Sequence, residues 1–301
     1  MESAHDYSRS GPPRRAPLPD RDLGVRRPGD ERIVDSPQNA AVKRARALER
    51  DRSIREREAV YIAWGRHLAQ EAVRTLAPLR QAFAGPHLLE SREGRDVLRG
   101  LSGAGVPVLR VTTRILEAIV EGSGDQGILL LCARPEHTPS RLLHSAVSLV
   151  LAVHGVQDPG NLGSILRSAW ALGAAGVITL PGCADPFGSR AVRAAMGAQF
   201  VLPIAAADTG EFLALARAAR LQLVAADPDG PVAPHHADLT LPTILLLGSE
   251  GGGLPAELLD AAQRRVRIPM AHGVESMNVH AAAVAILYEA ARQRGFRYGV
   301  D

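Results

Sequence analysis

The segment Val274-Glu275-Ser276-Met277-Asn278-Val279 runs directly into an apolar helical pattern over residues 280–293. Ser and Asn often cap helices, because their side-chain oxygens accept hydrogen bonds from the N–H groups of the first turn. The same free N–H groups can also form a site for a carboxylate or a phosphate. Taken alone, the segment allows either a structural cap or an anion site. The upstream sequence decides between them.

Composition predicts a globular protein of two domains. The chain has 301 residues, 46% of them hydrophobic, enough for two separate cores. The net charge is only +3, and Lys43 is the only lysine. Arginine suits phosphate oxygens better than lysine does, which favours a nucleic-acid partner, although a high-GC genome produces the same bias.

Neither a metal centre nor a membrane segment is indicated. Cys132 and Cys183 are far apart, and the cysteines and histidines show no metal-ligand spacing. No apolar run reaches the roughly 18 residues that a membrane span needs. The N-terminus lacks an apolar signal core and contains Asp6, Asp20 and Asp22, so we expect a cytoplasmic protein.

The first part of the chain divides into an arm and a small domain. Residues 1–37 are rich in Pro, Arg, Asp and Gly and predict a disordered basic arm, either a solvated tail or an RNA contact. Residues 38–134 alternate helical and strand patterns, which predicts a small α/β domain with a largely parallel sheet. A polar, Pro-containing linker follows at 134–140. The expected helices are 41–57, 67–79, 93–101 and 113–121, and the expected strands are 61–65, 86–89, 106–111 and 127–132.

Residues 141–301 predict a second α/β unit. Ligands of such parallel sheets bind at the carboxyl ends of the strands, so the loops after the strands are candidate sites. The expected strands are 145–153, 176–180, 201–205, 222–226, 240–247 and 265–268, and the expected helices are 161–172, 190–198, 210–219, 255–262 and 280–293.

Two of these strand ends are unusual. The first continues into Asp158-Pro159-Gly160-Asn161, where Asn161 can cap the following helix, and Arg167 comes six residues later. This loop carries neither the P-loop nor the dinucleotide fingerprint. The second ends in Gly248-Ser249-Glu250-Gly251-Gly252-Gly253, which isolates one carboxylate among glycines. Glycines weaken regular structure by about 1 kcal/mol each, so close backbone approach or positive φ is predicted, with a flexible turn as the alternative.

Three ordered segments together resemble the motifs of the SpoU class (TrmH-like) of the SPOUT RNA methyltransferases. The resemblance covers residues 145–295, and residues 189–198 resemble the stretch between the first and second motifs. Residues 40–132 resemble, less closely, the ribosomal-protein-like substrate-binding domain that precedes many of these enzymes. The segments are Asn161…Arg167, then Gly248-Ser249-Glu250-Gly251, then Ile268-Pro269 with Ser276-Met277-Asn278-Val279.

The resemblance implies a fold, a cofactor and an assembly. The expected fold is an α/β-knot, in which the C-terminal segment passes through a loop to give a trefoil knot. S-adenosylmethionine is expected in the knot, held mainly by backbone groups of Gly248, Ile268 and Met277. Proteins of this class are homodimers with the site near the interface, so a homodimer is expected here.

The resemblance also implies roles for side chains. Arg167 matches the arginine proposed to act at the target ribose, and Arg193 is expected to hold a neighbouring phosphate. The family mechanism often makes the arginine a base, but a guanidinium stays protonated at neutral pH. We therefore expect Arg167 to clamp a phosphate and stabilise the developing alkoxide, and to act as a base only once RNA is bound. The other polar residues expected around the ribose are Asn161, Glu250, Ser276 and Asn278.

Three positions depart from the family pattern. Met277 replaces the usual leucine, a tolerable exchange for a backbone contact. His280 stands where a small residue, often serine, is common, and it either faces solvent at the helix start or lies near the RNA. Trp64 stands before Gly65 where the accessory domain usually has glutamate.

The function that these features predict is S-adenosylmethionine-dependent 2'-O-methylation of a ribose in structured RNA, with ribosomal RNA favoured over transfer RNA. The alternative of another class is a non-catalytic RNA-binding or ribosome-assembly factor on the same fold. The presence of every polar motif residue argues against it. A dinucleotide-binding enzyme would need the missing glycine fingerprint. Base methylation by a related knotted family is the weaker remaining alternative.

Overall fold

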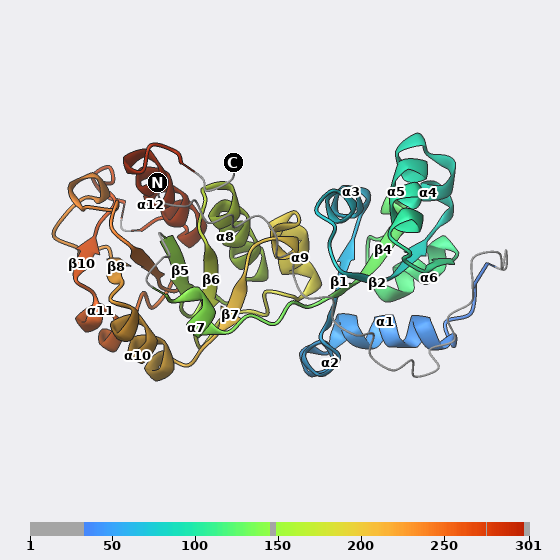
Figure 1. Cartoon of the computed structure of the whole chain (residues 1–301), viewed down its shortest axis with the longest axis horizontal. Coiled ribbons are helices and arrows are strands. Elements are labelled where there is room, and N and C mark those ends of the chain that lie inside the picture. Colours follow the sequence, from blue (N-terminus) through green and yellow to red (C-terminus); the bar gives the residue numbers. More distant parts are fainter. Residues whose placement is uncertain (1–32, 145–148, 275, 298–301) are drawn as a thin grey trace, which may run out of the picture.

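The computed structural model describes residues 33–144, 149–274 and 276–297, which form two α/β units side by side along the long axis (Figure 1). Most of the predicted arm, residues 1–32, lies outside the described residues. Val34 forms a parallel bridge with Val111 and donates its N–H to the Arg110 carbonyl oxygen at 2.9 Å. Val34, which the prediction assigns to the arm, therefore extends the edge of the first sheet.

The first unit is built on a four-stranded sheet in the order β1-β4-β2-β3. Its strands are β1 (Val60–Trp64), β2 (Leu79–Ala84), β3 (Val108–Arg110) and β4 (Ile128–Ala133). Its helices are α1 (Ala40–Arg50), α2 (Arg52–Glu58), α3 (Arg66–Arg74), α4 (Pro86–Glu90), α5 (Arg92–Gly103) and α6 (Thr113–Ile119), with the 3-10 turn η1 (Gly124–Gln126).

This sheet is mostly antiparallel, so the largely parallel sheet predicted for residues 38–134 is wrong. Strand β4 runs antiparallel to β1 and to β2, and β2 and β3 form the parallel pair. The error arises at β2, because the prediction gives no strand to residues 80–84 and places Leu79 at the end of a helix. The segment predicted as strand 86–89 is instead helix α4, which begins with Pro86 at a position where a missing N–H costs nothing.

The predicted helix 41–57 is two helices. Asp51 is extended, and its carboxylate accepts the N–H of Ser53 at 2.8 Å, which caps α2. The charged sequence hides this cap, because arginines surround it on both sides. The break matters because it turns α2 away from α1 and toward the second unit (Figure 1).

The second unit has a six-stranded sheet, and every pair of neighbouring strands is parallel, as predicted. The order is β10-β8-β9-β5-β6-β7. The strands are β5 (Leu149–Val153), β6 (Gly176–Thr179), β7 (Ile204–Ala206), β8 (Gln222–Ala226), β9 (Thr243–Leu247) and β10 (Arg264–Val266). The helices are α7 (Pro139–Leu142), α8 (Pro159–Ala171), α9 (Ser189–Ala195), α10 (Thr209–Ala219), α11 (Ala256–Ala261) and α12 (Val279–Gln293), with the 3-10 turns η2 (Ala198–Phe200) and η3 (Pro234–His236).

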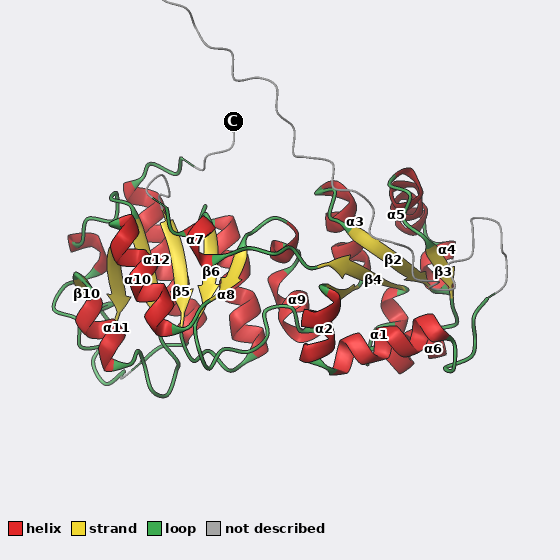
Figure 2. Ribbon diagram, turned by 60° about the horizontal axis from the view of Figure 1, so that its bottom comes forward, coloured by secondary structure: helices red, strands yellow, loops and turns green. Residues whose placement is uncertain are grey.

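Helices cover both faces of this sheet (Figure 2). Apolar residues of α8, α9 and α12 pack on one face, and those of α7, α10 and α11 pack on the other. Both β5 and β9 are buried along their whole length, as expected for central parallel strands covered on two sides. The core on the first face continues into the first unit, where it includes Ala63 and Leu68.

The centre of the sheet positions the candidate site. From β5 the chain builds outward through β6 and β7, then returns to the other side of β5 to form β8 and β9. The crevice between β5 and β9 is thus a point of reversal in strand order, where parallel α/β sheets bind ligands.

Candidate active site

The predicted segments converge at the carboxyl ends of β5 and β9. The loop after β5 and the glycine loop after β9 face each other across a cavity of ≈ 300 Å³, and the first residue of α12 closes it. Its lining residues are Gly155, Val156, Gln157, Asp158, Ser249, Glu250, Gly251, Gly252 and Val279.

Three side chains from separate segments form one hydrogen-bonded cluster. The Asn161 amide donates from Nδ2 to Glu250 Oε1 at 2.8 Å, and the Asn278 amide donates to the same oxygen at 2.6 Å. Asn278 Nδ2 also lies 3.2 Å from Asn161 Oδ1. The carboxylate is therefore held by two amide donors, one at the start of α8 and one at the start of α12.

Asn278 both caps α12 and holds the Glu250 carboxylate. Its Oδ1 accepts the N–H groups of His280 at 3.0 Å and Ala281 at 3.3 Å, which caps α12, while its Nδ2 holds Glu250. Asn161, in contrast, does not cap α8. Asp158 does so, accepting the Asn161 N–H at 2.7 Å, and this leaves the Asn161 amide free to reach Glu250.

The glycine loop folds back on itself. Ser249 and Gly253 exchange two backbone hydrogen bonds of 3.1 and 3.0 Å, and Gly253 has φ +62°. A Cβ on Gly248 would lie 2.2 Å from the Gly253 carbonyl carbon. The loop's own backbone therefore requires glycine at 248, whereas a Cβ on Gly251 would meet nothing within 4 Å.

Arg167 lies apart from the cluster. It is exposed on α8, about 9 Å further along the helix axis than Asn161, and it forms no hydrogen bond or ion pair with the described residues. The hydroxyl oxygen Oγ of the neighbouring Ser168 lies 2.9 Å from His280 Nε2. Burial lowers the pKa of His280, and the positive charge of Arg167 lowers it further. His280 therefore contacts α8 beside Arg167 and does not simply face solvent at the helix start.

The remaining predicted residues do not line the cavity. Ser276 is exposed, Met277 is 40% exposed, and Ile268 is half-buried against the main core. Arg193 is exposed on α9, where its guanidinium carbon lies 4.5 Å from the centre of the Trp64 ring. The structure thus joins Asn161, Glu250 and Asn278, and it leaves the other predicted residues outside that cluster.

Sequence reasoning gave no role to two residues of the cavity wall. Gln157 and Asp158 lie in the loop between β5 and α8, and Asp158 fixes the start of α8. The dipeptide Asp158-Pro159 indicates this cap in the sequence, since proline favours the first helical position and the residue before it is then the cap. Within residues 33–144, 149–274 and 276–297, no group of three His, Cys, Asp or Glu side chains could hold a metal ion. No helix in the same ranges is both long and apolar enough to cross a membrane.

Comparison with known proteins identifies the family. Residues 148–288 match the SpoU rRNA Methylase family. A Synechocystis protein named an uncharacterized tRNA/rRNA methyltransferase is 32% identical over 263 residues, which cover 87% of this chain and 94% of the relative. The chain belongs to the SpoU methylase family. The resemblance predicted from the three motifs is therefore confirmed.

Two further relatives of this SpoU methylase carry more specific names. The 23S rRNA (uridine(2479)-2'-O)-methyltransferase of Streptomyces viridochromogenes is 30% identical over 280 residues, which cover 91% of this chain and 96% of the relative. The AdoMet-bound rRNA methyltransferase structure from Sinorhizobium meliloti has a TM-score of 0.77 and 32% identity, and the match covers 87% of this chain and 97% of that chain.

The residues of the site suit S-adenosylmethionine. The cavity of ≈ 300 Å³ is at the lower end of the range of ligand clefts, about 300–1,000 Å³. Its glycine-rich wall leaves the backbone accessible to a ligand, and the Glu250 carboxylate lies at its edge.

Proposed function

We propose that this SpoU methylase transfers the methyl group of S-adenosylmethionine to a ribose 2'-hydroxyl in structured RNA, with ribosomal RNA as the favoured substrate. The observation that carries the proposal is the Glu250 carboxylate, held by the amides of Asn161 and Asn278 at the edge of the cavity. The names of the relatives support both the reaction and the RNA class.

Glu250 has one oxygen free for the substrate. Both amide donors bind Oε1, and no donor among the described residues binds Oε2. A fixed carboxylate oxygen at a cavity wall can accept the hydrogen of a ribose hydroxyl and orient its lone pair. Positioning of this kind supplies much of the rate when a weak nucleophile attacks a reactive methyl group.

Arg167 is the proposed partner of the RNA phosphate and of the developing alkoxide. It is exposed and has no anionic partner in the described part of the chain, so binding of a phosphate costs no existing ion pair. Its bidentate donors suit phosphate geometry. Ser276, exposed beside Asn278, is proposed to contact the same ribose.

The cofactor supplies an electrophilic methyl group on a cationic sulfur. We assign its binding to backbone groups of Gly248, Ile268 and Met277, which lie at the ends of β9 and β10 and before α12. Of these, Gly248 directly follows the strand that leads to Glu250, so cofactor binding and carboxylate placement depend on the same loop.

The wider architecture is proposed from the family. It comprises a trefoil knot in residues 141–301, a homodimer through that domain, and an RNA-binding role for residues 38–134. The chain passes from the edge strand β10 back to the crevice between β5 and β9, where the first residue of α12 lies, and this path supports the knot. The exposed arginines of both units support RNA binding. The cytoplasm, where ribosomal RNA is modified, is the proposed location.

The test is methyl transfer from labelled S-adenosylmethionine to unmodified ribosomal and transfer RNA, with nucleoside analysis of the product. Label in a 2'-O-methyl nucleoside of ribosomal RNA is expected. Glu250→Gln should lower kcat/KM by roughly 10- to 100-fold, the value of a hydrogen bond to a charged group, and leave cofactor affinity nearly unchanged. The matched control is Glu257→Gln, since Glu257 is exposed on α11.

Label in transfer RNA alone would reassign the substrate, and label in a base would exclude ribose chemistry. Cofactor binding without transfer to any RNA would favour the non-catalytic alternative.

A further inference from the structure

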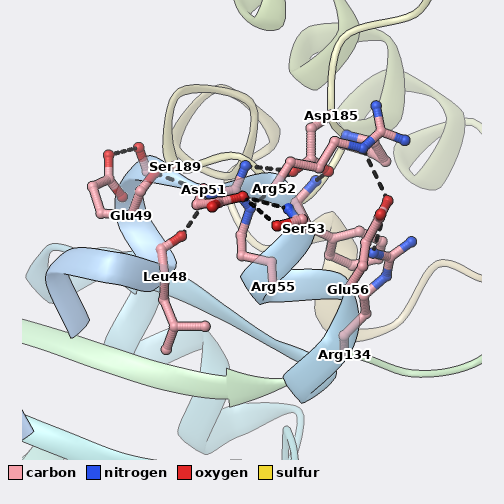
Figure 3. A network of polar contacts seen from close by, with 12 residues as sticks. Leu48, Glu49, Asp51, Arg52, Ser53, Arg55, Glu56, Arg134, Asp185 and Ser189 are labelled. Carbon is pink, nitrogen blue, oxygen red and sulfur yellow. Dashed lines mark hydrogen bonds and ion pairs between the residues drawn. The ribbon is translucent and has the colours of Figure 1, made fainter. Parts of the chain in front are cut away.

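The two units are joined by buried polar contacts between α1–α2 and the loop before α9 (Figure 3). Arg55 is only 6% exposed, and its Nε donates to Asp185 Oδ2 at 2.8 Å. Its Nη1 donates to the carbonyl oxygens of Leu48 and Glu49. Ser189 donates to Glu49 Oε1 at 2.5 Å, and burial raises the pKa of Glu49. The junction is therefore a packed interface within the chain.

Aromatic contacts fix the same loop. The Phe187 ring lies 5.1 Å from the ring of Tyr61, and the guanidinium carbon of Arg134 lies 4.6 Å from the Phe187 ring centre. Both Tyr61 and Phe187 are buried. Because this loop leads directly into α9, the first unit determines where α9 begins.

Helix α9 presents Arg193 to a residue of the first unit. The guanidinium carbon stacks 4.5 Å from the Trp64 ring centre, while Trp64 itself is only 7% exposed. Stacking on an indole holds a guanidinium in one plane and leaves its N–H edge available. Arg193 is exposed and pairs with no carboxylate among the described residues, so that edge is free for an anion.

Other positive groups surround this stack. Arg190 lies one turn earlier on α9, and Arg66 begins α3 just after Trp64. Both are exposed and form no ion pair in the described ranges. The nearest acids in the sequence, Glu71 for Arg66 and Asp185 for Arg190, are already paired with Arg74 and Arg55. The surface formed by Arg66, Arg190 and Arg193, here called the junction surface, therefore carries a net positive charge.

This surface adjoins the helix that carries the active site. Helix α9 packs closely on α8, because a Cβ on Gly163 would lie 2.3 Å from the Ala191 carbonyl oxygen. Gly163 is two residues from Asn161 on the same helix. Helix α9 thus lies between the helix that carries Asn161 and the first unit (Figure 1).

We propose that Trp64 is a positioning residue for Arg193, and that the two units share an RNA-backbone-binding surface formed by Arg66, Arg190 and Arg193. The inference rests on the proposed function for the identity of its polyanion.

The test measures binding of full-length protein to ribosomal RNA across a series of salt concentrations, with KM for RNA and kcat measured in parallel. Arg193→Ala should weaken RNA binding about tenfold. It should also reduce the slope of the logarithm of the binding constant against the logarithm of the salt concentration by about one. Trp64→Leu should weaken binding about three- to tenfold and raise KM for RNA without lowering kcat, whereas Trp64→Phe, which keeps an aromatic face, should stay within about threefold of the wild type.

The control for arginine removal is Arg217→Ala, because Arg217 is exposed on α10, on the other face of the sheet. Thermal unfolding establishes that each variant is folded. The double variant Trp64→Leu/Arg193→Ala distinguishes positioning from general structure, because Trp64→Leu should have no further effect on binding once Arg193 is absent.

The positioning role of Trp64 would be overturned if Trp64→Leu weakened RNA binding equally in the wild type and in Arg193→Ala. It would also be overturned if Trp64→Phe bound RNA as weakly as Trp64→Leu. Unchanged binding in Arg193→Ala would overturn the shared surface. If the wild type binds RNA with this dependence but transfers no methyl group, the proposed function fails and the junction surface stands.

Discussion

Substitution of Asn278 separates its two functions. Asn278→Ala removes the cap of α12 and the donor to Glu250 together, whereas Asn278→Asp keeps an oxygen for the Oδ1 contacts to His280 and Ala281. Aspartate and asparagine cap equally well, and loss of a cap costs about 0.5–2 kcal/mol. The aspartate, however, places a second carboxylate where an amide now donates to Glu250 at 2.6 Å.

The expected magnitudes follow from these contacts. Asn278→Ala should lower Tm by roughly 2–4 °C for each kcal/mol lost. Asn278→Asp keeps the cap and should lower Tm by less, through repulsion between two exposed carboxylates of about 0.2–1 kcal/mol. Both should lower kcat/KM by about 10- to 150-fold, since a hydrogen bond to a charged group contributes about 1.5–3 kcal/mol. Calorimetry and steady-state methyl transfer measure the two effects separately. Wild-type activity in Asn278→Asp, with the fold intact, would refute the role of the amide in holding Glu250.

Three further predictions concern packing and protonation. Gly163→Ala should destabilise the fold by about 1–3 kcal/mol in denaturant unfolding, because its Cβ would strike the Ala191 carbonyl oxygen. The control Gly210→Ala on α10 should not, and a Gly163→Ala variant as stable as the wild type would contradict the α8–α9 contact. Arg55→Ala should lower the free energy of unfolding by about 3–5 kcal/mol, since it leaves the largely buried Asp185 carboxylate unpaired. A loss below about 1 kcal/mol in denaturant unfolding would show that this ion pair contributes little to stability. The pKa of His280 is lowered in the fold, so the unfolded chain binds the proton more readily, and the stability from neutral His280 is present above pH 6.5 and lost as pH falls below it. As pH falls, the Tm of His280→Gln should therefore decline less steeply than that of the wild type. Identical slopes of Tm against pH would contradict the lowered pKa.

Strand and helix patterns predicted the second unit well because its sheet is parallel and covered on both faces. Continuous apolar runs such as Thr243–Leu247 occur in few other settings. The first unit was predicted less well, because β2 carries Arg80 and Gln81 among its apolar residues and has no clear period. Strand direction there also depends on pairing across the sheet, which local sequence does not encode.

The active-site cluster could be predicted as a set of residues but not as a geometry. Asn161, Glu250 and Asn278 come from three distant segments, and only the strand order brings them to one edge of the sheet. The position of Arg167, outside the cluster and beside His280, follows from helix rotation together with the packing of α12 on α8. The packing partner is a tertiary property, so sequence spacing could not supply it.

The segment 274–279 alone could not decide between a helix cap and a functional site, because one side chain both caps α12 and holds the carboxylate of the proposed site. An asparagine amide has an acceptor and a donor at its two ends, and Asn278 uses the acceptor for the first turn of α12 and the donor for Glu250. A serine at 278 could accept from the helix, but its shorter side chain has no second donor group to extend toward the carboxylate. The requirement for both ends explains why asparagine, among the residues that cap well, occupies this position. It also couples the start of α12 to the orientation of the carboxylate, so a shift of that helix would move the proposed reacting group.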